Sequence, residues 1–206
     1  MNAEVSEEAT SGVTSEKLAG IILAAGASRR MGSPKALLDY RGETFVGRLV
    51  RIFSCCCDVV IVVAGVHAEL IRGRMDRRAR LVINPDPDRG QLSSLQTALA
   101  EVPRDAAGFL FTPVDCPTVR EETIETLIHA FHKNRTLFAI PRYHGRRGHP
   151  VCVRASLIAE FLALPPTAET RAVVNMHADR ITYIDVDDPG VLADVDDLEA
   201  YRKIAK

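Results

Sequence analysis

The sequence predicts an α/β fold in which helices cover a mostly parallel sheet. Short apolar runs recur along the chain, and they are continuous rather than alternating, as in strands that are buried on both faces. Stretches whose apolar residues have helical spacing lie between these runs. Alternation of strand and helix is typical of a parallel sheet with helices packed on it.

The individual elements follow from the same patterns. Five apolar runs predict strands, over 18–24, 59–64, 79–83, 108–112 and 137–140. Three amphipathic stretches predict helices, over 44–54, 93–102 and 121–131. The last third is less regular and predicts a short strand over 151–153, helices over 155–163 and 170–177, and a second strand over 181–185. Its place in the chain suggests a segment that covers the site as a lid.

Composition indicates one globular domain after a tail. Residues 1–17 are rich in Glu, Ser and Thr and have few apolar side chains, so we interpret them as a disordered tail or a cloning remnant. No linker or repeat divides the rest, and 18–206 are expected to form a single domain. The 26 basic and 27 acidic residues nearly balance, which argues against a nucleic-acid binder that relies on bulk positive charge.

The cysteines and apolar stretches bear on the compartment. Five cysteines, three of them consecutive at Cys55, Cys56 and Cys57, form no CxxC pair. Neither a zinc site nor a disulfide framework is therefore expected, and a reducing compartment suits them. No apolar stretch approaches the roughly 18 residues of a membrane span, and no signal-peptide pattern begins the chain. The sequence predicts a cytoplasmic protein without a membrane partner.

A glycine-bearing loop follows the first predicted strand, at the edge where ligands bind in open α/β sheets. Gly26 and Gly32 let backbone amides approach an anion, and Arg30 and Lys35 add full positive charge. We predict that this loop binds the phosphates of a nucleotide, through Leu23, Ala24, Ala25, Gly26, Ser28 and Gly32. A glycine-containing turn with solvated basic side chains is the alternative interpretation.

Two better-known phosphate loops do not match this stretch. A Walker A loop has four residues between its glycines and then Lys-Ser or Lys-Thr, whereas five residues separate Gly26 from Gly32. A dinucleotide fingerprint needs GxGxxG, which is absent from the loop. The loop therefore belongs to neither of these classes.

Two further segments carry polar side chains at the expected ligand edge. Asp115 follows an apolar strand, where a carboxylate suits Mg²⁺, a hard cation that prefers oxygen ligands. A helix cap or a turn is the alternative for this residue. Ser93 and Ser94 stand at a predicted helix start, where amides and hydroxyls can receive polar groups of a nucleotide. Ser93 alternatively caps the helix.

The stretch from Leu23 to Lys35 resembles the LAAGxSxRMGxxK signature of the MobA-like NTP transferases, which include the molybdenum-cofactor nucleotidyltransferases. Ala25 is similar to the cytidylyltransferase branch, which reads LAAG, rather than to the guanylyltransferase branch, which reads LAGG. The resemblance extends over roughly 18–204. It implies a Rossmann-like three-layer αβα sandwich with a mostly parallel mixed sheet, of the nucleotide-diphospho-sugar transferase type.

The resemblance also implies roles for the other motifs. Residues 90–95 resemble a GxxxSL segment that lies beside the base and sugar. Asp115 occupies the metal-ligand position of a D-x-P motif, although Cys116 replaces the Gln that is common in the cytidylyltransferase branch. Asp194 and Asp196 match the D-x-D part of a C-terminal motif and are candidate second metal ligands. A solvated acidic loop is the alternative there.

On the acceptor side the resemblance is looser. Residues 145–151 are similar to a GxPV segment, in which Arg146, Arg147 and His149 would bind the acceptor and the arginines would clamp its phosphate. A surface or hydrogen-bonded histidine is the alternative for His149. Arg171 is what remains of a GDxGAR segment, and it would also bind the acceptor.

These motifs predict a Mg²⁺-dependent nucleotidyltransferase. It would move NMP from an NTP, CTP by the branch resemblance, to a phosphorylated acceptor and release pyrophosphate, with Lys35, Arg30 and Asp115 as catalytic residues. The resemblance implies molybdopterin as the acceptor and a client molybdoenzyme as a partner. Transfer to a sugar or polyol phosphate is an alternative. A non-catalytic nucleotide-binding accessory protein for molybdoenzymes is another.

Overall fold

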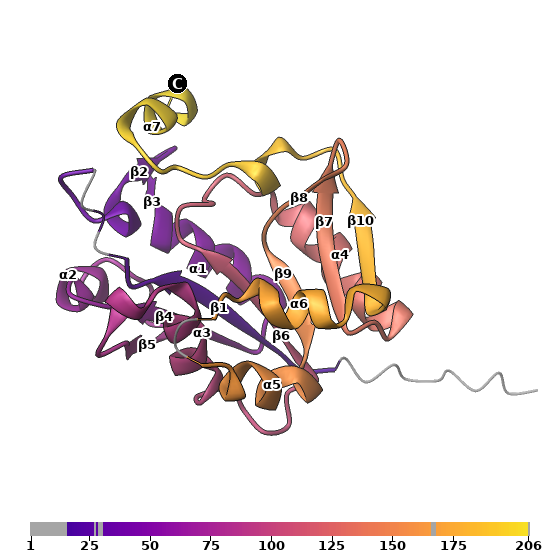
Figure 1. Cartoon of the computed structure of the whole chain (residues 1–206). Coiled ribbons are helices and arrows are strands. Elements are labelled where there is room, and N and C mark those ends of the chain that lie inside the picture. The colour runs from indigo at the N-terminus through magenta and orange to yellow at the C-terminus, as the bar shows by residue number, and fades with distance from the viewer. Residues whose placement is uncertain (1–15, 27, 29–30, 166–167, 206) are drawn as a thin grey trace, which may run out of the picture.

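The computed structural model describes residues 16–26, 28, 31–165 and 168–205 (Figure 1). The predicted tail over 1–17 lies outside this part of the chain except for its last two residues. Glu16 pairs with Arg154, and Lys17 pairs with Asp105. The end of the predicted tail is therefore joined to the folded chain by ion pairs just before the first strand begins.

A sheet of eight strands forms the centre of the fold. Seven strands lie side by side in the order β10-β7-β9-β6-β1-β4-β5, and β8 pairs with β7. Their bounds are β1 Leu18–Ala24, β4 Val59–Ala64, β5 Ala79–Ile83, β6 Gly108–Pro113, β7 Phe138–Tyr143, β8 Arg146–Arg147, β9 Val151–Arg154 and β10 Ile181–Asp185. Each strand predicted from an apolar run is present.

The directions of the strands make this a mixed sheet. β1 is parallel to β4 and to β6, β4 is parallel to β5, and β7 is parallel to β10. β9 is the exception, because it runs antiparallel between β6 and β7. The short β8 is also antiparallel to β7. The mostly parallel mixed sheet that the family resemblance implies is therefore confirmed.

Helices cover both faces of this sheet. On one face lie α1 (Phe45–Cys56), α2 (Ala68–Arg72) and α4 (Glu121–Asn134). On the other lie α3 (Gln91–Leu99), α5 (Ile158–Ala163) and α6 (Arg171–Met176). Successive residues of β1 alternate between the two cores: Ile22 packs with the first set of helices, and Ile21 with the second. The three-layer αβα arrangement is confirmed.

Several short elements have no counterpart in the sequence prediction. They are α2, β8, the strands β2 (Asp39–Tyr40) and β3 (Glu43–Thr44), and the helix α7 (Leu198–Ile204). There are also 3₁₀ turns at Lys35–Leu37, Pro87–Arg89, Ala178–Arg180 and Pro189–Leu192, whereas the one at Ala155–Leu157 begins the helix predicted over 155–163. Elements this short carry too few residues for a periodic pattern. Within the described residues, no helix has the length and apolar character needed to cross a bilayer.

Candidate nucleotide-binding site

The site is built where the neighbouring strands β1 and β6 end. These strands are parallel, with Leu23 opposite Pro113, so the loops that follow them leave the sheet at the same edge. Val114 donates its backbone N–H to the Leu23 carbonyl at 3.0 Å and extends this pairing. As a result, the glycine-bearing loop after β1 and Asp115 after β6 lie side by side, as the sequence predicts for a ligand site in an α/β sheet.

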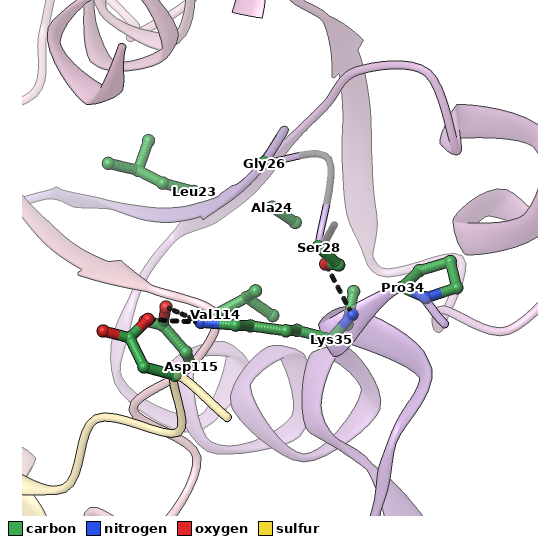
Figure 2. A pocket seen from close by; sticks show the side chains of 10 residues that line it. Leu23, Ala24, Gly26, Ser28, Pro34, Lys35, Val114 and Asp115 are labelled. Atoms are coloured by element: carbon green, nitrogen blue, oxygen red, sulfur yellow. Dashed lines mark hydrogen bonds and ion pairs between the residues drawn. The ribbon is translucent and has the colours of Figure 1, made fainter. Parts of the chain in front are cut away.

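A cavity of about 330 Å³ opens between the two loops. It is lined by Leu23, Ala24, Gly26, Ser28, Pro34, Lys35, Ala36, Val114, Asp115 and Asp196. Figure 2 shows the side chain of Lys35 stretching across it from the loop toward Asp115. Four of the predicted nucleotide-binding residues and both described members of the predicted catalytic set therefore face one space. Arg30, the third predicted catalytic residue, lies outside the described residues.

Lys35 is the charged centre of this cavity. Its ammonium group donates to Asp115 Oδ2 at 3.1 Å and to Asp196 Oδ1 at 2.6 Å. Burial alone would lower the pKa of Lys35, but hydrogen bonds and charge from Asp196 and Asp115 outweigh burial, so its pKa is raised. Lys35 is therefore positively charged throughout the physiological pH range and can bind an anion.

Three carboxylates gather around this lysine. Asp115, Asp194 and Asp196 each offer one oxygen, and these oxygens all lie within 4.8 Å of one another. The segment that carries Asp194 and Asp196 is joined to Asp115 by a hydrogen bond of 3.0 Å, which Val195 N donates to the Asp115 carbonyl. Carboxylate oxygens are what Mg²⁺ and similar hard cations prefer, so this group of residues fits a hydrated divalent ion.

The shape of the loop depends on two residues with positive φ. Gly32 has a φ of +69°, a conformation that side chains with a Cβ rarely adopt, and Ser28 has a φ of +49°. Ser28 accepts the backbone N–H of Met31 on its carbonyl and that of Lys35 on its hydroxyl, both at 2.9 Å. A Cβ at Gly26 would meet no atom of the described residues within 4 Å, which leaves the backbone at this position open to a ligand.

A second cavity of about 220 Å³ adjoins the first and shares Leu23, Gly26 and Asp115 with it. The start of α3 forms its other wall, with Ala25 and Ser94 among the lining residues. The two serines predicted to bind the nucleotide differ in what their side chains contact. Ser94 faces the cavity, whereas Ser93 donates to the Gly90 carbonyl at 2.8 Å and is absent from the lining of either cavity.

Asn84 holds these two serines in place, and the sequence interpretation does not include it. Its side-chain amide donates to the hydroxyl of Ser93 at 2.9 Å and to that of Ser94 at 3.0 Å. Because the Ser94 oxygen accepts from Asn84, its hydroxyl proton can point toward the cavity. The sequence signal that could have identified Asn84 is its position directly after the apolar run of β5.

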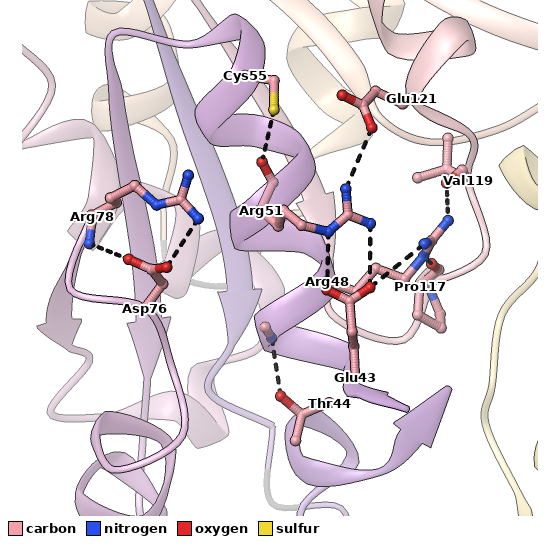
Figure 3. A network of polar contacts seen from close by, with 11 residues as sticks. Glu43, Thr44, Arg48, Arg51, Cys55, Asp76, Arg78, Pro117, Val119 and Glu121 are labelled. Atoms are coloured by element: carbon pink, nitrogen blue, oxygen red, sulfur yellow. Dashed lines mark hydrogen bonds and ion pairs between the residues drawn. The ribbon is translucent and has the colours of Figure 1, made fainter. Parts of the chain in front are cut away.

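Arg48 anchors the loop that carries Asp115 and is also absent from the sequence interpretation. Its guanidinium donates to the carbonyls of Pro117 at 2.7 Å and Val119 at 3.2 Å, as Figure 3 shows. These contacts tie α1 to the chain just after β6. No local motif marks Arg48, because its partners are backbone atoms about 70 residues away.

The arginines predicted for the acceptor do not form one cluster in the described structure. Arg146 and Arg147 are exposed on β8, and the Arg147 guanidinium lies 4.8 Å from the ring centroid of Tyr183. Arg171 lines a different cavity, of about 450 Å³, which also contains Arg89. That cavity shares Gly90 and Gln91, at the start of α3, with the second cavity. Arg171 therefore lies near the start of α3.

His149 has a different character from these arginines. Burial lowers its pKa, and the charge of Asp115 and a hydrogen bond with the Phe111 backbone oppose this effect only in part. Its Nδ1 is buried and has no hydrogen-bond partner among the described residues. The ring packs edge-on against Phe111 with centroids 5.8 Å apart. A neutral imidazole of this kind can form a hydrogen bond with a ligand but adds no positive charge.

At the edge of the sheet, the open loop after β1 faces a group of carboxylates. This fold and this site define the class of the protein, a nucleotidyltransferase. The chain belongs to the MobA-like NTP transferase family, whose domain matches residues 20–181. This confirms the family resemblance of the loop. The match begins within β1 and ends at the first residue of β10, and it includes the other six strands of the central sheet in full.

Relatives with curated names point in two directions. A probable molybdenum cofactor guanylyltransferase of Rhodopirellula baltica is 32% identical over 122 residues, which cover 58% of this chain and 58% of that protein. The chain therefore matches less than two thirds of that relative's length. Nicotine blue oxidoreductase of Paenarthrobacter nicotinovorans is 31% identical over 200 residues, covering 90% of this chain and 95% of that protein. The relatives named as transferases are guanylyltransferases, so they do not confirm a preference for CTP.

Solved structures agree on the fold. The Rv0371c protein of Mycobacterium tuberculosis H37Rv is 29% identical with a TM-score of 0.78, covering 93% of this chain and 98% of that one. A manganese complex of the same protein is 26% identical with a TM-score of 0.72, covering 93% and 99%. A divalent metal is thus present in a structural relative, and Mg²⁺ itself is not shown by these comparisons.

Proposed function

We propose that this chain is a Mg²⁺-dependent nucleotidyltransferase that transfers a nucleotidyl group from an NTP to a phosphorylated acceptor. The observation that carries the proposal is the position of Lys35, paired with Asp115 and Asp196 inside a cavity walled by the glycine-bearing loop. Such a site pairs a fixed cation with oxygen ligands for a divalent ion, next to open backbone. A metal-bound triphosphate requires both kinds of group.

The reaction needs positioning more than covalent help from the protein. An oxygen of the acceptor phosphate forms a bond to the α-phosphorus of the NTP, and the bond from that phosphorus to the bridging oxygen of pyrophosphate breaks. Lys35 neutralises charge on the phosphates, and the open backbone at Gly26 lets their oxygens approach. Asp115, with Asp194 or Asp196, would hold Mg²⁺, which neutralises the triphosphate and polarises its oxygens.

We further propose CTP as the donor and molybdopterin as the acceptor. Ala25 supports the donor assignment, because it lines the second cavity beside Ser94 and has the residue type of the cytidylyltransferase branch. The acceptor assignment rests on the family and on the guanylyltransferase relatives. Arg146, Arg147 and His149 would contact the acceptor. Arg171 lines the cavity beside α3, so the nucleotide-side cavity would lie between it and the acceptor.

The test is pyrophosphate release with Mg²⁺, each NTP in turn and a panel of acceptors. We expect release with CTP and molybdopterin, and we expect Lys35→Ala and Asp115→Ala each to slow it by about 10²–10³. Arg72→Ala is a matched control, because Arg72 is an exposed arginine of α2 that pairs only with the neighbouring Glu69 among the described residues. Release at an unchanged rate in both site variants would contradict the proposed catalytic residues.

The same assay separates the other functions. Release with a sugar phosphate or polyol phosphate, and not with molybdopterin, would keep the chemistry and replace the acceptor. Uptake of an NTP without turnover would favour the accessory role for a client molybdoenzyme. The match over nearly the full length to nicotine blue oxidoreductase supports one further candidate, a redox enzyme on this scaffold. Oxidation or reduction of nicotine blue with an added redox partner, without pyrophosphate release, would identify it.

A further inference from the structure

A separate cavity lies on the other side of the segments that carry the carboxylates. It has a volume of about 440 Å³ and shares no lining residue with the two nucleotide-side cavities. Its walls come from the β2–β3 hairpin, α1, the loop before α4, the turn at Pro189–Leu192 and α7. Elements from both ends of the chain therefore meet around it.

Cations from four of these elements face this cavity. Its lining residues include Arg41, Arg48, Arg120 and Lys203, with Asp188 as the single acidic member. Convergence of four positive side chains on one space costs electrostatic free energy unless an anion compensates it. The cavity is therefore of the kind that receives a negatively charged ligand.

The carboxylate of Asp188 is already engaged and offers little compensation. It is 2% exposed, and it accepts from Arg120 N at 2.9 Å, Thr123 Oγ1 at 2.8 Å and Gly190 N at 2.8 Å. These bonds join the start of α4 to the turn at Pro189–Leu192. Its charge also pairs with Arg120, whose Nε lies 3.8 Å from Asp188 Oδ1, and Arg48 likewise has a carboxylate partner, with Nη1 3.9 Å from Glu43 Oε2.

The other cations differ in how far their charge is satisfied. Arg41 lies 5.2 Å from the ring centroid of Tyr40, and among the described residues no carboxylate forms an ion pair with it. Lys203 pairs with Glu199 at 2.9 Å, but both side chains are more than two thirds exposed, so this pair is weak. Arg41 and Lys203 are therefore the groups with the most charge to offer a ligand.

Besides the bonds from Arg48 to Pro117 and Val119, two contacts that involve no cation hold the cavity in shape. Tyr201 of α7 donates to the Asp39 carbonyl of β2 at 2.9 Å, and its ring packs edge-on against Phe45 with centroids 6.1 Å apart. These contacts hold α7 on the hairpin. Arg41 and Lys203 are thus brought together by packing, so that a ligand does not have to order the two elements itself.

We propose that this cavity is a second anion-binding site, for a small molecule that bears phosphate. Arginine matches phosphate oxygens with two donors at once, which favours phosphate over a single carboxylate. Thr118 and Ala193 line the cavity, and each lies within three residues of a carboxylate of the nucleotide side, Asp115 or Asp194. A ligand bound here would contact both of the segments that carry Asp115 and Asp194, on the side away from the nucleotide cavities. The proposal does not depend on the transferase activity.

The experiment is calorimetric titration of the full chain with inorganic pyrophosphate in EDTA. Without a divalent ion, the three carboxylates of the nucleotide side repel this anion, so binding there is suppressed. We expect Arg41→Ala and Lys203→Ala each to weaken binding about tenfold, because each removes a charged hydrogen-bond donor. Arg72→Ala, which removes an exposed arginine from α2, is the control for net charge and should leave binding unchanged.

Lys35→Ala distinguishes the two sites, because it removes the cation of the nucleotide side and leaves this cavity intact. Metal-free binding that survives in Lys35→Ala supports the proposal. Binding that is lost in Lys35→Ala but retained in Arg41→Ala and Lys203→Ala would overturn it, as would an equal loss in Arg72→Ala. Absence of any pyrophosphate binding to the unaltered protein would also overturn it.

Discussion

The proposed nucleotide side and the proposed acceptor side of this molecule differ in how their charged groups are held. Lys35, Asp115 and Asp196 come from three distant segments and meet through direct contacts of 3.1 Å and 2.6 Å. Arg146 and Arg147, by contrast, are exposed on a two-residue strand, and Arg171 lies at another cavity. One side is an assembled site before any ligand arrives, and the other is a set of separate cations.

This difference indicates which part of the chemistry the fold itself supplies. A preorganised charge pair suits the step that all members of a nucleotidyltransferase family share, the handling of a triphosphate. Exposed arginines contribute affinity and orientation for an acceptor but need the ligand to bring them together. We therefore expect substitutions on the nucleotide side to affect turnover most, and substitutions on the acceptor side to affect mainly the KM of the acceptor.

The largest expected effect is the loss of kcat in Lys35→Ala, and Arg147→Ala is the variant with which it is compared. Loss of the buried lysine should lower kcat for pyrophosphate release by about 10²–10³, because a preorganised cation is removed from the transferring phosphates. Arg147→Ala should raise the KM of the acceptor and leave kcat within a few-fold. Steady-state kinetics of both variants measure this directly. Equal effects on kcat would remove the distinction between the two sides.

A second comparison concerns neighbouring acids, Asp196 and Asp197. Asp196→Asn should weaken binding of Mg²⁺ or Mn²⁺ at least about tenfold, since it removes one oxygen of the three-carboxylate group. Asp197 instead caps α7 by accepting the Ala200 N–H at 2.8 Å. Asp197→Ala should therefore cost about 1 kcal/mol of stability and leave metal affinity unchanged. Metal titrations and denaturant unfolding of both variants decide between these roles, and metal affinity that falls equally in both would count against Asp196 as a ligand.

Asn84→Asp should have an intermediate effect on the nucleotide side. The substitution keeps the size of the side chain but removes the amide that donates to Ser93 and Ser94. We expect the KM of the NTP to rise about tenfold and the free energy of unfolding to fall by about 1–3 kcal/mol, because buried acceptors lose their donor. A stability loss without any change in the KM would restrict Asn84 to a structural role.

The smallest effect is expected in the pH dependence of stability. Burial lowers the pKa of His149, so the unfolded chain binds this proton more tightly than the folded chain does. Stability should therefore fall as the pH falls through the ordinary histidine pKa of about 6.5. His149→Gln should lessen that fall, measured as the difference in unfolding free energy between a neutral and a mildly acidic buffer. An unchanged difference would show that His149 does not titrate in this way.

Long regular elements could be predicted from the sequence, and short or contact-dependent ones could not. β1, β4 and β5 have the predicted bounds, because a continuous apolar run is itself the signal of a buried strand. The antiparallel direction of β9 has no local signal, since direction is set by partner strands far away in the sequence. α7 begins within an acidic stretch and has seven residues, too few for a helical pattern to stand out.

The acidic C-terminal stretch shows the same limit for the site. Apart from the family resemblance, which singles out Asp194 and Asp196, its aspartates look alike in the sequence. In the structure, Asp185 pairs with Arg142, Asp188 is buried and holds the start of α4, and Asp197 caps α7. Asp194 and Asp196 are the pair that lies beside Asp115. These roles depend on what the fold places opposite each side chain, which spacing does not encode.

The most direct test of the account is calorimetric titration of the chain with CTP, with and without Mg²⁺. The account predicts that CTP binds when Mg²⁺ is present, and that EDTA or Asp115→Ala weakens this binding strongly. Nucleotide binding that is equally tight without a divalent ion, or that is unaffected by Asp115→Ala, would contradict the proposed site. So would the absence of binding for every NTP.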